Sequence, residues 1–367
     1  MSDLLRMMAT GITVLRKPLR VPTRPLHFQL EPATGCNLRC KMCQVPDYGP
    51  DQQKYMSLEK FKHIFDQIRP IRVALSGAGE PFLNPDLLGI IRYAHVGGAN
   101  VLTTTNFTLC SNKIEDILTS GLSLLKVSLD AVTPQTYKTI RGLDLFGRII
   151  QSIGTLQRLK RKRGLKTPYL RLQFVLQHDN LDEIVPMVDL AKDLDANAVY
   201  FQPLETLLVP DRKAELTQGV EFEDLKERLV KARDRAHELG VETNAGVLVR
   251  SLHSYFRKYE PGIPSEPPQR VCLLPWFSLY ITVDGDVRPC CSFGEGETLV
   301  LGNLFKESFA DIWNGIKYRD LRQRALDRNL TYTVCRNCTP NRLRDWVRLA
   351  GVLPGFLSGS AEPPEGF

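Results

Sequence analysis

Nine cysteines are the residues of this sequence with the clearest potential for chemistry. Eight of them fall into two groups near the two ends of the chain, and only Cys110 stands apart. The first group is Cys36, Cys40 and Cys43, and the second lies between residues 272 and 338. Because the sequence shows no secretory signal, grouped cysteines indicate metal or redox chemistry rather than disulfide bonds. Cys110 is expected to be a small buried hydrophobic residue.

The first three cysteines have a spacing that suits a metal cluster with one open position. They follow the pattern C-x-x-x-C-x-x-C. Three thiolates can bind three irons of a four-iron cluster, so the fourth iron stays open to another molecule, as one position stays open in catalytic zinc sites. Thiolate is also the donor that iron–sulfur clusters require. A structural zinc site is the alternative, but it usually takes a fourth ligand from nearby, and none is obvious here.

The second group can supply four thiolates to one metal centre. Its members are Cys272, Cys290 or Cys291, Cys335 and Cys338. Four protein ligands leave no iron open, so such a cluster suits electron transfer or structural support better than substrate binding. Spacing alone does not decide between an iron–sulfur cluster and a structural zinc site. The strand alternation also leaves the choice between Cys290 and Cys291 open.

Short strands that alternate with helices must position these cysteines. Six strands are predicted at 26–31, 71–76, 100–105, 124–130, 169–177 and 197–203. Repeated strand–helix–strand units imply parallel strands with right-handed crossovers. Six such units favour an α/β fold with a partial TIM-like (β/α)6 barrel over the complete eight-unit form. The first cysteine group directly follows the first strand, at the end of the barrel that holds active sites.

The second of the intervening helices has clear end signals. Asn84 is expected to be its N-cap with Pro85 in the first turn, and Gly97 and Gly98 follow its end.

Polar residues on one face of several strands indicate a ligand-binding interior, because buried parallel strands are normally apolar on both faces. These residues occupy every second position of the first, fourth and fifth strands: His27, Gln29 and Glu31; Lys126, Ser128 and Asp130; Arg171, Gln173 and Gln177. The helices must cover the apolar face, so the polar face is predicted to point into the barrel. An exposed antiparallel sheet is the alternative, and the helices between the strands count against it.

The sequence divides into five predicted parts. They are an N-terminal extension at 1–25, the barrel at 26–258, a Pro-rich linker at 259–270, a small cysteine-rich α+β module at 271–345 and a tail at 346–367. In the module, Asp284-Gly285 between two alternating strands predicts a β-hairpin.

The charge of the chain limits its partners only weakly. The formal net charge is +7, which permits an anionic substrate and does not require nucleic acid. Residues 4–15 are apolar but shorter than the ~20 residues that cross a bilayer. The basic residues after them, Arg16, Lys17, Arg20 and Arg24, could favour an anionic membrane surface. A simple packing segment is the alternative.

The first cysteine loop, EPATGCNLRCKMCQ, resembles the radical S-adenosylmethionine (SAM) superfamily, with Met42 as the hydrophobic residue before the last cysteine. The resemblance covers roughly residues 26–205. It implies that Cys36, Cys40 and Cys43 bind a [4Fe–4S] cluster whose open iron binds SAM. In this family the cluster cleaves SAM to a 5′-deoxyadenosyl radical, which abstracts hydrogen from the substrate.

The segment after the second strand, GAGEP at 77–81, is similar to the Gly-Gly-Glu element of the family. The resemblance implies that Gly79 and Glu80 contact the amino group of SAM. Ala78 replaces the first glycine of the element, and we expect the backbone contacts at the next two residues to be preserved.

Three later segments resemble further SAM contacts. Asn106 stands where the family often shows Thr-Asn-Gly, although Phe107 replaces the glycine. Ser128 and Asp130 resemble the element that contacts the SAM ribose, and Arg141 resembles the arginine that meets the SAM carboxylate. A core ion pair is the alternative for Asp130 and Arg141.

The C-terminal segment CLLPWFSLYITVDGDVRPCC, followed by LGNLF, IWN and CRNC, resembles the SPASM/Twitch module of radical SAM enzymes in its shorter, Twitch-like form. The resemblance implies one auxiliary [4Fe–4S] cluster. It favours Cys290 over Cys291, so the implied ligands are Cys272, Cys290, Cys335 and Cys338.

The resemblance implies a radical SAM oxidoreductase or maturase with an electron donor such as flavodoxin or ferredoxin. We expect the protein to be cytoplasmic, with contact to a membrane surface as a further option. The auxiliary cluster would accept an electron from the substrate or shape the pocket. Only about 25 residues precede the first strand, so we expect no leader-peptide recognition domain. We therefore expect a carbohydrate-like or lipid-linked small molecule as the substrate rather than a ribosomal peptide. A peptide-modifying maturase and a non-catalytic iron–sulfur or zinc protein are the alternatives.

No catalytic acid or base is assigned from the sequence. Gln173 and Gln202 are expected to line the substrate cavity. His178, just beyond the fifth strand, is a candidate for the mouth of the pocket, with an ordinary loop histidine as the alternative.

Overall fold

The structure is a computed structural model of the 367-residue chain, and it describes residues 3–43, 53–204, 215, 217–256, 271–293, 298–336 and 338. The linker predicted at 259–270 and the tail predicted at 346–367 both lie entirely outside the described residues.

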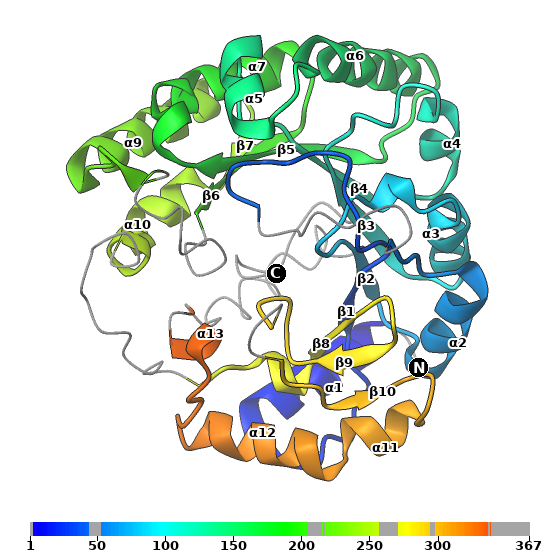
Figure 1. Cartoon of the computed structure of the whole chain (residues 1–367). Helices are drawn as coiled ribbons and strands as arrows, with labels where there is room; N and C mark the ends of the chain where they lie inside the picture. The colour runs from blue at the N-terminus through cyan, green and yellow to red at the C-terminus, as the bar shows by residue number, and fades with distance from the viewer. Residues whose placement is uncertain are drawn as a thin grey trace.

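One ten-stranded sheet forms the centre of the molecule, in the order β10-β9-β8-β1-β2-β3-β4-β5-β6-β7. The strands are β1 His27–Leu30, β2 Arg72–Leu75, β3 Asn100–Thr105, β4 Leu124–Ser128, β5 Tyr169–Leu176, β6 Ala198–Pro203, β7 Glu242–Thr243, β8 Ser278–Ile281, β9 Asp286–Arg288 and β10 Gly302–Asn303. Every pair from β8 to β7 is parallel. The sheet curves and stays open between its end strands, β10 and β7, so the predicted partial barrel is confirmed (Figure 1).

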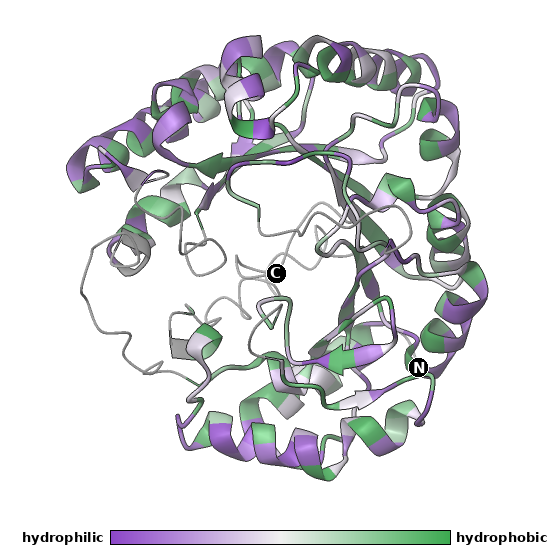
Figure 2. Cartoon of the chain, in the orientation of Figure 1, coloured by the Kyte–Doolittle hydropathy of each residue, from purple (hydrophilic) through white to green (hydrophobic). Residues whose placement is uncertain are grey.

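Helices surround the outside of the curved sheet (Figure 1). They are α1 Asp3–Arg16, α2 Leu58–Ile68, α3 Leu87–Val96, α4 Ile114–Thr119, α5 Pro134–Arg141, α6 Phe146–Lys162, α7 Ile184–Asp193, α9 Phe222–Leu239, α10 Ala245–Phe256, α11 Phe309–Trp313, α12 Ile316–Leu326 and α13 Thr333–Arg336. Short 3-10 turns are η2 Pro81–Leu83, η3 His178–Glu183 and η6 Leu274–Trp276. Both hydrophobic and hydrophilic residues occur along each outer helix, as amphipathic packing requires (Figure 2).

Helix α2 shows how the sequence builds this outer layer. The Ser57 hydroxyl accepts a hydrogen bond from the Lys60 N–H at 3.3 Å and caps the helix. Phe61, Ile64, Phe65 and Ile68 then recur at helical spacing and are buried. The apolar stripe therefore fixes which face of α2 lies against the sheet.

The start of α3 differs from the prediction. The helix begins at Leu87 with Asp86 as N-cap, two residues beyond the expected Asn84. The Asn84 side chain accepts a hydrogen bond from the Asp86 N–H at 2.8 Å and donates to the Pro32 and Met56 carbonyls at 2.9 and 2.8 Å. Asn84 is therefore a buried link between loops rather than a cap.

The cysteine-rich module extends the barrel sheet. Strand β8 pairs in parallel with β1, with His27 opposite Ser278. Strands β8 and β9 form the predicted hairpin, and Gly285 in its turn has φ 83°, a conformation that favours glycine. The module therefore lies directly beside the strand that precedes the first cysteine group.

The segment after α1 is fastened to this module by side chains that bind backbone groups. The indole N–H groups of Trp276 and Trp313 donate to the carbonyls of Pro18 and Thr23, at 2.9 and 3.0 Å. Arg322 is fully buried and donates to the Leu19 carbonyl at 2.9 Å. The two ends of the described chain are thereby joined.

Helix α1 has an exposed apolar stripe. Its members are Leu4, Leu5, Met8, Ile12 and Leu15, each 50 to 58% exposed. Its opposite side contributes the buried Thr10, Thr13 and Val14. Among the described residues, no helix combines the length and apolar character that a membrane crossing requires.

Candidate active site

A cavity of about 350 Å³ opens inside the barrel near the carboxyl ends of the strands. All three cysteines of the first group line it. The predicted inward polar faces are confirmed for five side chains on the wall of the cavity, which are His27, Gln29, Lys126, Ser128 and Gln173. Glu31, Asp130, Arg171 and Gln177 are buried but do not line the cavity.

Close backbone contacts hold the cysteine loop against the segment after β2. The backbone N–H groups of Gly79 and Glu80 donate to the carbonyls of Ala33 and Gly35, at 3.2 and 2.8 Å. A Cβ atom on Gly79 would lie 2.3 Å from the Gly35 carbonyl oxygen. Only glycine fits here, so the Gly79 position fixes the place of the cysteine loop.

Glu80 connects this segment to the end of β3. Its carboxylate accepts hydrogen bonds from the Thr105 hydroxyl at 2.6 Å and from the N–H groups of Phe82 and Asn106 at 3.0 and 2.8 Å. Burial raises the pKa of Glu80, and these hydrogen bonds lower it in part. Glu80 therefore organises the cavity wall as well as lining it.

The turn after β3 keeps a glycine-like backbone despite its phenylalanine. Phe107 is buried and has φ 60°, in the left-handed region that favours glycine. The preceding Asn106 donates from its side chain to Asn37 at 2.9 Å and to the Cys36 sulfur at 3.8 Å. The departure from Thr-Asn-Gly thus leaves the turn in place and Asn106 beside the cysteine loop.

Arg141, at the end of α5, joins the cysteine loop to the end of β4. Its guanidinium donates to the Cys40 sulfur at 3.5 Å and forms a buried ion pair with Asp130. Burial lowers the pKa of Arg141, but the charges of Asp130, Cys40 and Tyr137 together with the hydrogen bond to Cys40 raise this pKa above its ordinary value. Asp130 also accepts from the Val175 N–H at 2.7 Å and has φ 61°. Asp130 thus lies behind Arg141. The core ion pair between these two residues, which the sequence analysis gave as the alternative to SAM contacts, is present.

The donor set of the first loop suits an iron–sulfur cluster. Burial, helped by the charges of Glu80, Cys40 and Cys43 and opposed by the Leu38 N–H, raises the pKa of Cys36 to about 11. Bound iron would stabilise the thiolate form at neutral pH. Among the described residues, no three His, Cys, Asp or Glu side chains surround a single-ion site. A cluster differs from a single ion because it binds each sulfur at a separate iron.

The four implied auxiliary ligands lie close enough to influence one another. Burial raises the pKa of Cys272 well above its ordinary value, and the charges of Cys338, Cys290 and Cys335 add to the effect. Cys291 is near Cys290 and Cys338 as well. Burial and the charges of Arg171 and Arg72 lower the pKa of Lys126 on the cavity wall, and the charge of Cys291 offsets this in part. The choice of Cys290 over Cys291 as the ligand stays a prediction from the resemblance.

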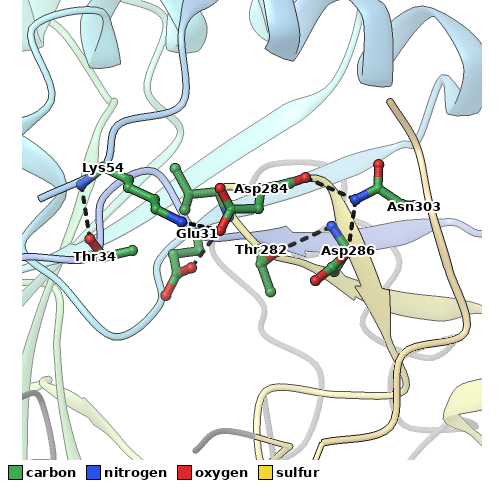
Figure 3. Close-up of polar contacts among 8 residues, drawn as sticks. Glu31, Thr34, Lys54, Thr282, Asp284, Asp286 and Asn303 are labelled. Carbon is green, nitrogen blue, oxygen red and sulfur yellow. Dashed lines mark hydrogen bonds and ion pairs between the residues drawn. The ribbon is translucent and has the colours of Figure 1, made fainter. Parts of the chain in front are cut away.

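The junction between the module and the cysteine loop is polar (Figure 3). Glu31, just after β1, accepts hydrogen bonds from the N–H groups of Ala78 and Val283, both at 3.3 Å. Lys54 and Asp284 form an ion pair at 2.7 Å across the same junction. Glu31 therefore links three separate segments beside the cavity. Its carboxylate points to these N–H groups, so the side chain does not line the cavity.

The three residues expected in the substrate pocket separate in the structure. Gln173 and Gln202 lie on the cavity wall. His178 does not, because it begins η3 outside the barrel, is exposed, and contacts the Gln218 carbonyl through Nδ1 at 2.6 Å. Arg72 was missed as a cavity residue, and its signal was the inward alternation of β2 with Ala74 and Ser76.

Fold, cavity and cysteine spacing together define a radical SAM enzyme. The profile of the radical SAM superfamily matches residues 30–191, and that of the SPASM iron–sulfur cluster-binding domain matches residues 272–339. The chain therefore belongs to the radical SAM superfamily and carries a SPASM domain. Its cofactors are [4Fe–4S] clusters and SAM.

Among the relatives is the AdoMet-dependent heme synthase of Methanosarcina barkeri, 28% identical over 320 residues, which cover 81% of this chain and 85% of that protein. The antilisterial bacteriocin subtilosin biosynthesis protein AlbA of Bacillus subtilis is 25% identical over 301 residues, with 79% and 60% covered.

Solved structures share the fold. Streptococcus suis SuiB bound to the precursor peptide SuiA has a TM-score of 0.62 and 16% identity, with 85% of this chain and 70% of that chain covered. Native anSMEcpe with bound AdoMet has a TM-score of 0.58 and 16% identity, with 86% and 87% covered.

Proposed function

We propose that this enzyme cleaves SAM and removes hydrogen from a carbohydrate-like or lipid-linked small molecule held inside the barrel. The observation that most directly supports this proposal is that Cys36, Cys40 and Cys43 line one cavity together with the polar side chains of the barrel strands. The three cysteines would hold the first [4Fe–4S] cluster. When bound, that cluster supplies the electron that cleaves SAM to methionine and a 5′-deoxyadenosyl radical.

Residues around the cysteine loop would hold SAM. Gly79, Glu80, Asn106, Ser128 and Arg141 all line the cavity near this loop. Arg141 offers a cation for the SAM carboxylate. The backbone at Gly79 holds this segment in close contact with the cysteine loop. Asp130 is a positioning residue, because it acts through Arg141.

The auxiliary cluster would be held by Cys272, Cys290, Cys335 and Cys338. When bound, it supplies a nearby acceptor for an electron from the substrate, which gives a net oxidation. The position of β8 beside β1 supports this role, because it places the module next to the catalytic loop. A donor such as flavodoxin or ferredoxin would reduce the first cluster.

The substrate class has two candidates. A cavity of about 350 Å³ is within the range typical of small-molecule pockets, which supports a small substrate. A ribosomal peptide is the second candidate, supported by the names of AlbA, which belongs to bacteriocin biosynthesis, and of SuiB, solved with a precursor peptide. Release of 5′-deoxyadenosine above background in the presence of candidate compounds distinguishes the two.

A membrane surface is the proposed docking partner of α1. At 100° per residue, Leu4, Leu5, Met8, Ile12 and Leu15 fall within an arc of about 100°. Exposed basic residues follow the stripe, which are Arg16, Arg20 and Arg24. An apolar face flanked by cations suits an anionic lipid surface.

The Cys40→Ala variant tests the central proposal. The protein is reconstituted anaerobically with iron and sulfide, and 5′-deoxyadenosine formation from SAM is measured with dithionite as reductant. The parent is expected to hold ~8 irons and to cleave SAM, while the variant loses cleavage by at least ~100-fold because the cluster loses a ligand.

Cys110→Ala is the matched control, since Cys110 is buried but does not line the cavity. It should keep the iron content and the cleavage rate. Cleavage by Cys40→Ala at the parent rate would contradict the proposal, and about four irons in the parent would remove the auxiliary cluster.

A further inference from the structure

One buried tyrosine hydroxyl beside the cysteine loop has no hydrogen-bond partner among the described residues. Tyr137, on α5, has no exposed surface, and its hydroxyl neither donates nor accepts a hydrogen bond within the described part of the chain. Its ring packs in the core against the Phe146 ring, with the two centroids 6.0 Å apart. A buried hydroxyl without a partner costs free energy, so this group calls for an acceptor other than the neighbouring side chains.

The hydroxyl belongs to the side of α5 that faces the cysteine loop. Tyr137 and Arg141 are four residues apart, and residues at this spacing share one face of a helix. Arg141 donates to the Cys40 sulfur at 3.5 Å. The Lys41 N–H donates to the Ile140 carbonyl at 2.9 Å, so the loop also contacts the backbone of the same helix. The face that carries Tyr137 is therefore packed against the loop that would hold the first cluster.

The electrostatic surroundings of Tyr137 agree with this placement. Burial raises the pKa of Tyr137, the charge of Arg141 opposes this effect, and the charges of Cys40, Asp130 and Cys36 add to it. Two cysteines of the first group are thus close enough to affect the hydroxyl. A phenol whose pKa is raised stays protonated at neutral pH and can donate a hydrogen bond.

Sulfur is the acceptor best placed to receive this donor. Among the groups that affect the pKa of Tyr137, Arg141 has donors only. The two carboxylate oxygens of Asp130 already accept, one from Arg141 and the other from a backbone N–H at 2.7 Å. The remaining groups are the sulfurs of Cys36 and Cys40. A [4Fe–4S] cluster on these cysteines would bring its own sulfides as further acceptors.

We propose that the Tyr137 hydroxyl donates a hydrogen bond to a sulfur of the first cluster, either the Cys40 thiolate or a sulfide, and thereby raises the reduction potential of this cluster. The inference rests on the proposed function, because it requires a cluster on Cys36, Cys40 and Cys43. Hydrogen bonds to the sulfurs are among the factors that set the potential of an iron–sulfur cluster. The reduced cluster carries one more negative charge and accepts the stronger hydrogen bond, so the bond favours reduction.

A redox titration of the Tyr137→Phe variant tests this inference. The change removes the hydroxyl and keeps the ring that packs against Phe146. The anaerobically reconstituted proteins are titrated with dithionite while the electron paramagnetic resonance signal of the first cluster is followed, which is the signal that Cys40→Ala loses. The equilibrium constant for reduction should fall about tenfold in Tyr137→Phe, which for one electron lowers the potential by about 59 mV.

Tyr93→Phe is the matched control. The Tyr93 hydroxyl, on α3, donates to Asp66 at 2.9 Å, and neither residue lines the cavity. This variant should keep the parent potential. Equal potentials for the parent and Tyr137→Phe would overturn the inference, and so would an equal fall in the two phenylalanine variants.

A measurement on the parent protein decides the case in which Tyr137→Phe does not assemble its first cluster. The parent is prepared with tyrosine that carries ¹³C at the ring carbon bonded to the hydroxyl. Electron–nuclear double resonance of the reduced first cluster should then detect a weak ¹³C coupling, which a tyrosine that only packs in the core would not give. No ¹³C coupling in the parent would overturn the inference.

Failure of this inference differs from failure of the proposed function. A parent that holds the first cluster and cleaves SAM, but has the same potential as Tyr137→Phe, would contradict the role of Tyr137 alone. A parent whose potential depends on Tyr137 but that does not cleave SAM would keep this inference and contradict the proposed function.

Discussion

At the scale of single residues, the cavity depends on a buried ion pair that orients a cation. Asp130 is completely buried, holds Arg141 through one carboxylate oxygen and accepts the Val175 N–H through the other. Arg141 in turn reaches the Cys40 sulfur. The position of the cation offered to SAM is therefore set by a residue that does not line the cavity.

Asp130→Asn should separate positioning from packing. Removing one charge of a buried pair leaves the other uncompensated, so the free energy of unfolding should fall by about 3–5 kcal/mol. Because Arg141 loses its orienting partner, KM for SAM should rise about tenfold or more while the iron content stays unchanged. Denaturant unfolding and SAM-dependent kinetics measure the two effects.

Asp320→Asn is the control for this change. Its exposed pair with Arg324, at 2.7 Å, should contribute less than about 1 kcal/mol. A fall in stability of Asp130→Asn with an unchanged KM would assign Asp130 a structural role only.

Some of these residue positions could be predicted from the sequence. The spacing of Cys36, Cys40 and Cys43 and the alternation that carries Lys126 inward are local patterns, and they placed these side chains on one cavity. The positions of the Asp130 and His178 side chains were harder to predict. The two-residue alternation of a strand does not show where the strand ends and the chain turns outward. The left-handed φ of Asp130 redirects its side chain, and no local sequence pattern predicts this conformation.

At the scale of elements, the N-terminal segment and the module depend on each other. Arg322 on α12 donates to the carbonyls of Pro275 and Leu19 at 3.0 and 2.9 Å. Its guanidinium also lies over the rings of Trp313 and Tyr318, 4.7 and 4.9 Å from their centroids. One buried cation thus joins the segment after α1 to two elements of the module.

Arg322→Gln should loosen this junction. It removes two charge-assisted hydrogen bonds and two ring contacts, so we expect the free energy of unfolding to fall by about 3 kcal/mol. Arg324→Gln, two residues away on an exposed face of the same helix, should cost less than about 0.5 kcal/mol. Urea denaturation measures both, and equal effects would argue against the role of Arg322.

Sequence patterns predicted the elements better than their connections. The predicted strand 100–105 coincides with β3, and the other five strands differ by one or two residues at one or both ends. Apolar runs and the Asp284-Gly285 turn are short-range signals. The parallel pairing of β8 with β1 was not predicted, because its partners are about 250 residues apart. Asn84 was misassigned because its partners, Pro32 and Met56, also come from distant loops.

At the scale of the whole molecule, the two ends of the described chain meet on one side of the barrel. Trp276 and Trp313 of the module donate hydrogen bonds to the segment after α1. Strand β8 of the module lies beside β1 (Figure 1). The catalytic loop and the auxiliary cysteines are therefore on neighbouring strands of one sheet. Because α1, the barrel and the module are joined in this way, docking of α1 on a surface would bring the barrel and the module to the same surface.

Vesicle binding tests that docking. The parent should co-sediment with vesicles of phosphatidylglycerol and much less with vesicles of phosphatidylcholine, because the stripe needs apolar insertion and the basic flank needs anionic lipid.

Ile12→Glu places a charge in the middle of the stripe and should weaken binding about tenfold or more. Val96→Glu makes a similar change at another exposed apolar residue, 86% exposed at the end of α3, and should bind like the parent. Raising the salt concentration should also weaken binding, since the exposed cations at Arg16, Arg20 and Arg24 would be screened. Equal binding by the Ile12 and Val96 variants, or equal binding to both lipids, would show that the exposed face of α1 does not dock on a membrane.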